Sequence, residues 1–206
     1  MFDAALRRRL DAPLERLSGV LDVPVITPDR LSLTGLATGL ASAGAASQGW
    51  WATALVLWLL SRGLDGLDGP LARRRGRASE AGGFLDITAD FLVYGAGVVG
   101  VAVGTGSTYP FLAVLLAYYV NGTAFLAFSS AAERTGQQLD DGRTFSFVAG
   151  LAEGAETIAV HALWLLVPAW APAVAVVWAA VVGASAAQRM VEGTRVLRRA
   201  RTAGGE

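Results

Sequence analysis

Residues 65–90 read DGLDGPLARRRGRASEAGGFLDITAD and carry four aspartates in two pairs. Asp65 and Asp68 are three residues apart, and Asp86 and Asp90 are four apart, so the members of each pair share one face of a helix. Each pair stands at one end of an apolar segment, ~27 Å by helical rise from the far end of that segment. Two neighbouring antiparallel helices would therefore bring all four carboxylates to the same depth and aim them into one cavity.

These four carboxylates predict a site for divalent metal ions. Ionised carboxylates crowded into a small site repel one another, and hard divalent cations relieve that repulsion. The chain has no cysteine and a single histidine, so the ligands must be oxygen atoms, which favours Mg²⁺, Mn²⁺ or Ca²⁺, and we expect Mg²⁺ or Mn²⁺. Because two ions ~3.5–4 Å apart are the usual device for displacement at phosphorus, we expect two. The alternative is that the two acidic pairs are hydrated helix ends without a metal.

The rest of the sequence is typical of an integral membrane protein. It has 206 residues, 53% of them hydrophobic, a mean hydropathy of +0.47 and a formal net charge of zero. That charge balance argues against a nucleic-acid partner, which needs a basic face. A membrane-spanning helix needs about 20 mostly apolar residues. Six stretches qualify or nearly qualify: Leu31–Ser47, Trp50–Asp68, Gly83–Gly104, Tyr109–Ala132, Phe145–Val167 and Ala171–Ala187. We therefore expect an all-α, polytopic membrane protein with six transmembrane helices in a single domain, 1–206.

Charge is distributed unevenly between the two sides of these spans. Arginine-containing clusters precede the first span and follow the second, fourth and sixth, whereas the remaining connections are short and uncharged. By the positive-inside rule, all four clusters and both termini lie on the cytoplasmic side of the cell (inner) membrane. We interpret Arg74, Arg75 and Arg77 as contacts to anionic lipid or as topology signals. A soluble helical bundle is the alternative, but soluble loops would not partition charge in this way.

The first 26 residues predict an amphipathic juxtamembrane segment, which precedes the six-helix core at 27–200. Leucines recur at helical spacing among arginines from Phe2 to Leu21, which favours a helix lying on the bilayer surface. A helix packed on the protein itself fits the same pattern.

Local signals predict how two of the spans begin or end. Thr27 and Pro28 are the expected N-cap and first residue of the first span. Gly69-Pro70 is expected to break or kink the second span directly after Asp68, because proline lacks the backbone N–H that a helix needs.

With the small residues and the arginine between them, the aspartates form a longer pattern. It comprises eight residues at fixed spacing: Asp65, Asp68, Gly69, Ala72, Arg73, Gly82, Asp86 and Asp90. The chain here resembles the CDP-alcohol phosphatidyltransferase family, directly over these 26 residues and, through its six-span layout, over most of its length. The resemblance implies a six-helix membrane enzyme, usually a homodimer, that opens to the cytoplasm. Such enzymes displace CMP from a CDP-alcohol, commonly CDP-diacylglycerol, with an acceptor hydroxyl in phospholipid biosynthesis.

The resemblance also assigns roles to the pattern residues. It implies that Asp65, Asp68 and Asp86 bind one metal ion and that Asp65, Asp86 and Asp90 contact a second. It implies that Asp90 is the general base that takes the proton of the acceptor hydroxyl. The implied nucleotide-binding residues are Gly69, Ala72 and Gly82, which admit the cytidine nucleotide, and Arg73, which meets its diphosphate.

The acceptor alcohol is only weakly indicated. Glu153 and Glu156 are three residues apart in the fifth span, where a carboxylate is costly and therefore suggests function. They would either hydrogen-bond a polyol acceptor or pair with Arg134 or Arg189. These two arginines would otherwise bind a phosphorylated acceptor, such as glycerol 3-phosphate or inositol phosphate, or act only as topology charges. His161, deeper in the same span, is expected to be a packed, hydrogen-bonded residue rather than a catalyst.

Two other functions compete with this interpretation. A membrane prenyltransferase also holds a diphosphate with Mg²⁺ at aspartate-rich helix ends, but it requires neither Ala72-Arg73 nor Gly82. A small transporter or metal-binding membrane protein without enzymatic activity should carry polar residues into the outer half of its spans, and this sequence has few there.

Overall fold

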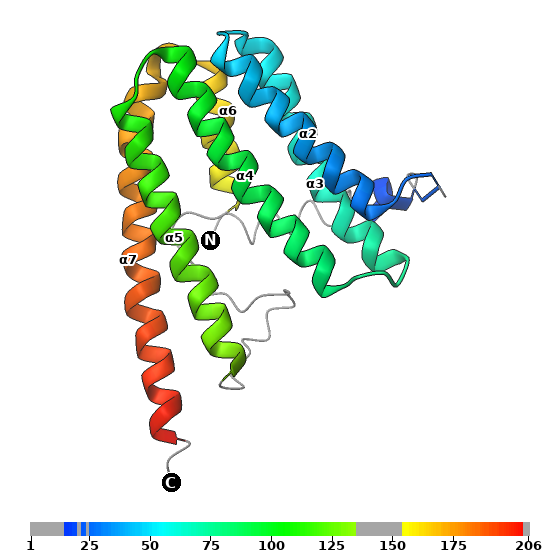
Figure 1. Cartoon of the computed structure of the whole chain (residues 1–206), viewed down its shortest axis with the longest axis vertical. Coiled ribbons are helices and arrows are strands. Elements are labelled where there is room, and N and C mark those ends of the chain that lie inside the picture. The colour runs from blue at the N-terminus through cyan, green and yellow to red at the C-terminus, as the bar shows by residue number, and fades with distance from the viewer. Residues whose placement is uncertain (1–14, 20–21, 24, 135–153, 204–206) are drawn as a thin grey trace.

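The computed structural model describes residues 15–19, 22–23, 25–134 and 154–203, and within them every regular element is a helix (Figure 1). The elements in chain order are α2 (Pro28–Ser47), α3 (Trp51–Arg74), α4 (Glu80–Thr105), α5 (Tyr109–Arg134), α6 (Gly154–Leu166), the 3₁₀ helix η1 (Pro168–Trp170) and α7 (Ala171–Ala203). The all-α prediction is confirmed for this part of the chain.

Three of these segments are long and apolar enough to cross a membrane: α4, α5 and the stretch Pro168–Arg198, which contains η1 and most of α7. The described part of α6 is apolar but only 13 residues long. The first two predicted spans correspond to α2 and α3, which are helices of 20 and 24 residues. The membrane class is confirmed, and the count of six spans stays a prediction. The predicted interfacial helix lies mostly outside the described residues, and within it 15–19 are helical.

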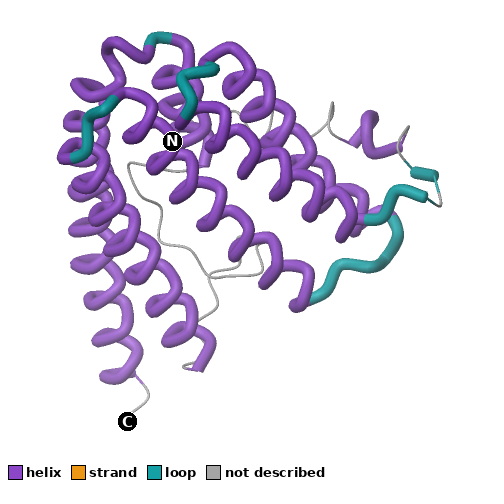
Figure 2. The backbone as a smooth tube through the Cα atoms, turned by 45° about the horizontal axis from the view of Figure 1, so that its top comes forward, coloured by secondary structure: helices purple, strands orange, loops and turns teal. Residues whose placement is uncertain are grey.

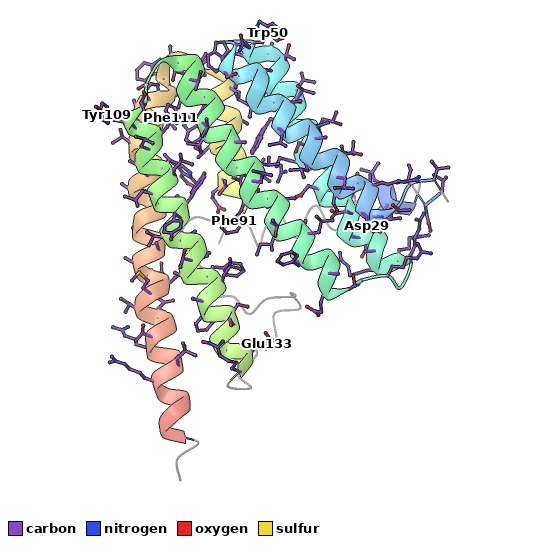
Figure 3. The ribbon with its side chains drawn as sticks, viewed as in Figure 1. Asp29, Trp50, Phe91, Tyr109, Phe111 and Glu133 are labelled. Atoms are coloured by element: carbon purple, nitrogen blue, oxygen red, sulfur yellow. The ribbon has the colours of Figure 1, made fainter. Side chains whose placement is uncertain are left out.

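The two ends of the molecule carry different side chains. Trp50 directly precedes α3 and is 64% exposed, and Tyr109 is the first residue of α5 and is 86% exposed. Figure 3 places both at one end together with Phe111, whereas Asp29 and Glu133 lie well away from that end. Exposed tryptophan and tyrosine are typical of a membrane interface. The arrangement therefore agrees with the charge separation seen in the sequence.

Helix α2 packs against both α3 and α4, and small residues bring the three backbones close together (Figure 1). On one side, Ser42 of α2 donates a hydrogen bond of 2.7 Å to the carbonyl of Ala54 in α3. On the other side, Gly100 of α4 lies so near the backbone of Ala43 that a methyl group there would collide with it. Helix α2 thus forms the layer that holds α3 and α4 in place.

Helices α3 and α4 are neighbours, as expected, but they meet through side chains, such as Trp58 and Tyr94 with ring centroids 5.8 Å apart. Their backbones approach each other closely at few points, because rings fill the space between them. His161 of α6 stacks on Trp58 of α3, with ring centroids 4.6 Å apart. On α4, a methyl group at Gly97 would come within 3.0 Å of the His161 imidazole. The Trp58 indole also donates to the carbonyl of Ile158 at 3.2 Å, so α6 is wedged between α3 and α4.

Helices α5 and α7 form a second pair, and they run side by side in both views (Figure 1 and Figure 2). The Trp178 indole of α7 donates a 2.8 Å hydrogen bond to the Tyr118 hydroxyl of α5. The same hydroxyl lies 3.1 Å from Nε2 of His161. His161, which lies between α3 and α4, therefore also contacts the α5–α7 pair. His161 is buried and hydrogen-bonded, as predicted.

Helix α3 continues through Pro70 to Arg74, so the break expected directly after Asp68 does not occur, and the alternative of a kink there stays a prediction. Pro70 lies close to the end of the helix, where its missing N–H removes a single backbone hydrogen bond. The next residue, Leu71, is fully buried and fixes this last turn to the core. Packing near the helix end therefore outweighs the local preference of proline.

The start of α2 matches its sequence signals. The Thr27 side chain accepts a hydrogen bond from the Arg30 backbone N–H, and Pro28 is the first helical residue. Both features satisfy or remove backbone donors that have no partner at a helix N-terminus.

The chain before α2 is tied to the end of α3 by two arginines. Arg75 pairs with Asp22 at 2.7 Å and donates to the carbonyls of Ile26 and Val23 at 2.6 and 2.9 Å. Arg74 also contacts Asp22, at 3.3 Å. The interpretation of these two arginines as lipid or topology residues is therefore incomplete, since both have structural partners within the protein.

Candidate functional site

Three of the four predicted carboxylates converge in the structure. Asp65 and Asp68 project from α3 and Asp86 from α4, and each offers an oxygen within 4.8 Å of the other two. The i, i+3 spacing places the α3 pair on one face, and the space between α3 and α4 lets Asp86 reach across to them. The predicted convergence of two helices on one acidic site thus appears for these three residues.

The oxygen set fits a hard divalent cation. An ion that binds oxygen at about 2.0–2.6 Å places its ligands up to about 4–5 Å apart, which matches the spacing of the three carboxylate oxygens. Asp68 is buried, whereas Asp65 and Asp86 are half-buried, so the group is partly accessible to solvent. No nitrogen or sulfur ligand belongs to this group, so the donor set suits Mg²⁺ or Mn²⁺.

Asp68 is oriented by a residue that the sequence did not reveal. The Ser32 hydroxyl of α2 donates a hydrogen bond to Oδ2 of Asp68. Ser32 stands on the second turn of α2, 36 residues away in the chain, and the α2–α3 packing brings the two together. A hydroxyl in an early helical turn carries no signal by itself, so only the fold identifies this contact.

Asp90, the predicted base, lies outside the group of three and has a different partner. Its Oδ1 accepts a hydrogen bond from Nη1 of Arg62 at 2.5 Å. The same nitrogen lies 3.5 Å from Oδ2 of Asp65. Arg62 therefore links a carboxylate of α3 to a carboxylate of α4 across the site.

Sequence reasoning did not single out Arg62, although a signal was present. An arginine inside an apolar span is costly and suggests function, and Arg62 precedes Asp65 by three residues, which places both on one helix face. Its side chain is only 5% exposed. The guanidinium carbon lies 5.3 Å from the ring centroid of Trp58 and 5.1 Å from that of Tyr94.

The residues assigned to the nucleotide lie beside the carboxylates on the two helices. Gly69 follows Asp68 directly, and a methyl group there would meet only the tip of the Arg73 side chain, at 3.4 Å. At Gly82, near the start of α4, a methyl group would meet only the Ser79 hydroxyl, also at 3.4 Å. Ala72 is half-buried and Arg73 is exposed at the end of α3. These positions present small or polar groups next to the acidic site.

The residues suggested for the acceptor are only partly described. Glu153 lies outside the described residues. Glu156 stands in the first turn of α6, and its Oε2 is buried without a hydrogen-bond partner among the described residues. Arg189 of α7 is buried, with its guanidinium 5.8 Å from the ring of Phe125. Arg134 ends α5, is exposed, and donates to the Ser130 hydroxyl at 3.0 Å.

Comparisons with known proteins point to the same chemistry as the acidic site. The family model described as CDP-alcohol phosphatidyltransferase matches residues 25–186. The inner membrane protein YnjF of Escherichia coli is 41% identical over 176 residues, which are 82% of this chain and 84% of that protein.

More distant relatives are named for an enzymatic activity. An archaetidylinositol phosphate synthase of Pyrococcus horikoshii is 39% identical over 48% of this chain and 53% of its own length. That of Methanothermobacter thermautotrophicus is 33% identical over 60% of this chain and 62% of its own length. The crystal structure of Mycobacterium tuberculosis phosphatidylinositol phosphate synthase with CDP-DAG bound is 21% identical, has a TM-score of 0.64, and is matched over 90% of this chain and 94% of that one. That likeness shows a shared fold.

Proposed function

We propose, from the premise that this chain belongs to the CDP-alcohol phosphatidyltransferase family, that it transfers a phosphatidyl-type group from CDP-diacylglycerol to a small alcohol and releases CMP. The membership makes the chain a membrane-embedded transferase of phospholipid synthesis, and it excludes the prenyltransferase and the non-enzymatic alternatives. The observation that carries the proposal is the convergence of Asp65, Asp68 and Asp86 from two helices.

Each carboxylate has a distinct part in this proposal. Asp65, Asp68 and Asp86 hold one divalent ion, Mg²⁺ or Mn²⁺, and Asp65 and Asp86 share a second with Asp90. Bound divalent ions supply charge that neutralises the diphosphate oxygens in the transition state. Ser32 keeps Asp68 turned toward the site through its hydrogen bond, as the partner of a ligating carboxylate commonly does.

Asp90 acts as the general base. It takes the proton of the acceptor hydroxyl while the oxygen attacks the phosphorus that carries the lipid. One phosphorus–oxygen bond forms to the acceptor, the bond to the CMP phosphate oxygen breaks, and CMP leaves with the electron pair. The open spaces at Gly69 and Gly82 admit the nucleotide together with Ala72, and Arg73 offers a planar pair of donors to its diphosphate.

The acceptor in this proposal is an alcohol or a polyol phosphate. Related proteins are named archaetidylinositol phosphate synthases, so a phosphorylated polyol is the first candidate. Arg134 and Arg189 would bind its phosphate, and Glu153 and Glu156 its hydroxyls. The buried Oε2 of Glu156, without a partner among the described residues, supports the second assignment.

The same premise extends to the setting of the enzyme. We infer six spans, with both termini and the active site on the cytoplasmic side of the inner membrane, and assembly as a homodimer. The name of the YnjF relative supports the inner membrane, and the separation of aromatic from charged ends supports the orientation.

An acceptor screen tests the proposal. Purified protein in lipid nanodiscs receives CDP-diacylglycerol, Mg²⁺ or Mn²⁺, and one acceptor at a time: glycerol 3-phosphate, inositol phosphate, free inositol or glycerol. CMP release and the mass of the lipid product are measured, with Asp65→Asn as the inactive control. The expected result is metal-dependent CMP release matched by one phospholipid product. The proposal fails if no CDP-alcohol, including those whose alcohol is not diacylglycerol, yields CMP with any acceptor.

A further inference from the structure

A buried arginine inside the acidic site needs an explanation of its own. Arg62 is 5% exposed and comes from the apolar part of α3. A buried charge is tolerated only when it is paired and hydrogen-bonded. Nη1 of Arg62 is paired with Asp90 and Asp65, the two carboxylates that lie one turn deeper along their helices than Asp68 and Asp86, whereas its Nε is buried without a hydrogen-bond partner among the described residues.

The surroundings of Arg62 form a built pocket. Nη1 lies 3.4 Å from the Tyr94 hydroxyl, and Nη2 donates to the Ser61 hydroxyl at 3.1 Å. The rings of Trp58 and Tyr94 both lie within cation–π range of the guanidinium. Nη1 thus contacts the two carboxylates and the Tyr94 hydroxyl, while Nη2 is held by the Ser61 hydroxyl.

Arg62 engages the carboxylates on which the proposed second metal ion depends. A divalent ion shared by Asp65 and Asp90 would draw on the same carboxylates that Nη1 now contacts. A guanidinium brings a single charge and a divalent ion brings two, so both relieve the same repulsion and compete for the same groups. Arg62 contacts both Asp65 and Asp90 among the ligands of the proposed second ion but only Asp65 among those of the first, so it competes more strongly with the second ion.

We propose that Arg62 is a positioning residue that holds Asp65 and Asp90 together before the second divalent ion binds and that competes with this ion for them. The inference rests on the proposed two-ion site. The inference predicts that the second ion binds more weakly than the first and that Arg62 determines the difference between the two affinities. Arg62 itself touches no substrate in this scheme.

Binding of Mn²⁺ to the purified, substrate-free protein tests the inference. Electron paramagnetic resonance of free Mn²⁺ gives the number of sites and their affinities for the wild type, Arg62→Gln and Arg62→Lys. Arg62→Gln removes the competing charge and should tighten the weaker site by about tenfold or more, which corresponds to roughly 1.4 kcal/mol or more. Arg62→Lys keeps the charge and should change it less than about threefold.

Two controls separate this effect from a general change. Arg77→Gln removes a charge from the exposed segment after α3 and should leave both sites unchanged. Arg62→Met also removes the charge, while its side chain can keep apolar contact with the rings of Trp58 and Tyr94, and it should also tighten the weaker site. This variant carries the test if Arg62→Gln does not fold, as judged by thermal melting in detergent.

The outcomes distinguish the inference from the proposed function. A second site that appears or tightens in Arg62→Gln supports the inference. An unchanged or weaker second site in a folded Arg62→Gln, or one site in every variant, overturns it. Release of CMP in the acceptor screen decides the proposed function separately, since activity with one ion or two would still establish the transfer reaction.

Discussion

The space between α3 and α4 is filled in two different ways along its length. In the part nearer the Trp50 end of α3, called the outer part here, ring side chains fill this space. Trp58, Tyr94 and His161 lie there with ring centroids between 4.6 and 5.8 Å apart, and the part nearer the Arg74 end is the inner part. In the inner part, the same space holds carboxylates and the guanidinium of Arg62, and Gly69 faces little but the tip of Arg73. The rings of the outer part keep the helices apart, and the inner part uses that separation for polar chemistry.

This difference indicates that stability and activity depend on different residues of the same two helices. Substitutions in the outer part should alter thermal stability and leave metal binding intact. Substitutions in the inner part should alter activity or metal binding and leave the fold intact. Each of the following predictions tests one side of that division.

The largest effect is expected at Asp90 in the inner part. Asp90→Asn keeps the size of the side chain but removes the proton acceptor, so CMP release should fall by about 10²–10⁴-fold. The amide oxygen of the variant can still accept the hydrogen bond of Arg62, so the variant should fold, with a melting midpoint lowered by the loss of the buried charge pair. Retained activity in this variant would refute the assignment of Asp90 as the base.

A smaller effect is expected at Ser32, which orients Asp68. Ser32→Ala removes that hydrogen bond, and loss of such a supporting partner typically lowers metal affinity or activity about 10–100-fold. The matched control is Ser47→Ala at the other end of α2, where the hydroxyl bonds only to the Gly44 carbonyl in its own helix. Titration of Mn²⁺ should show weaker binding in the first variant and none of that change in the second. Equal effects would show that the Ser32 contact has no special part in the site.

The sequence was sufficient to predict that Asp65, Asp68 and Asp86 converge, because helical spacing and equal depth determine which faces they occupy. It also predicted the cap at Thr27 and the packed state of His161, since these depend on local chemistry and on the apolar span around them. The break that local rules allowed at Pro70 does not occur, since α3 runs on to Arg74 and the next residue, Leu71, is buried.

The contacts that were missed are tertiary. The spacing of the aspartates does not predict that His161 packs between α3 and α4, nor that Ser32 donates a hydrogen bond to Asp68. Arg62 was visible as a charge in an apolar span, but its two carboxylate partners depend on how far α4 lies from α3. Periodicity gives the face of each helix, and the side chains that fill the gaps between helices are known only from the packing.

In the outer part, two glycines of α4 offer a matched pair. A methyl group at Gly97 would press on the His161 ring, whereas a methyl group at Gly95 would meet nothing within 4 Å. Gly97→Ala should cost about 1–3 kcal/mol of stability by overpacking, and Gly95→Ala should stabilise the helix by about 0.5–1 kcal/mol. Thermal melting in detergent measures both, and Mn²⁺ affinity should remain that of the wild type in each. A loss of metal binding in Gly97→Ala without a drop in stability would contradict the division between the two parts.

The smallest effect is expected at Asp22, outside the spans, where the chain before α2 meets the end of α3. The hydrogen bond from Arg75 lowers the pKa of Asp22 from its usual value of 3.8, with a further contribution from Arg74. A carboxyl whose pKa is lower in the folded state stabilises the fold above the unfolded-state value and loses that contribution as the pH falls through the folded-state pKa. Asp22→Asn should therefore lower the melting midpoint by about 1–2 °C at pH 7, since an exposed ion pair contributes little. At pH 3 the wild type and the variant should melt closer together, because the carboxylate of the wild type is then partly protonated. If the difference in melting midpoint is the same at both pH values, the substitution disturbs the segment for a reason other than the lost charge. Arg75→Gln, measured in the same way, then shows whether the hydrogen bonds of Arg75 to the backbone carbonyls are that reason.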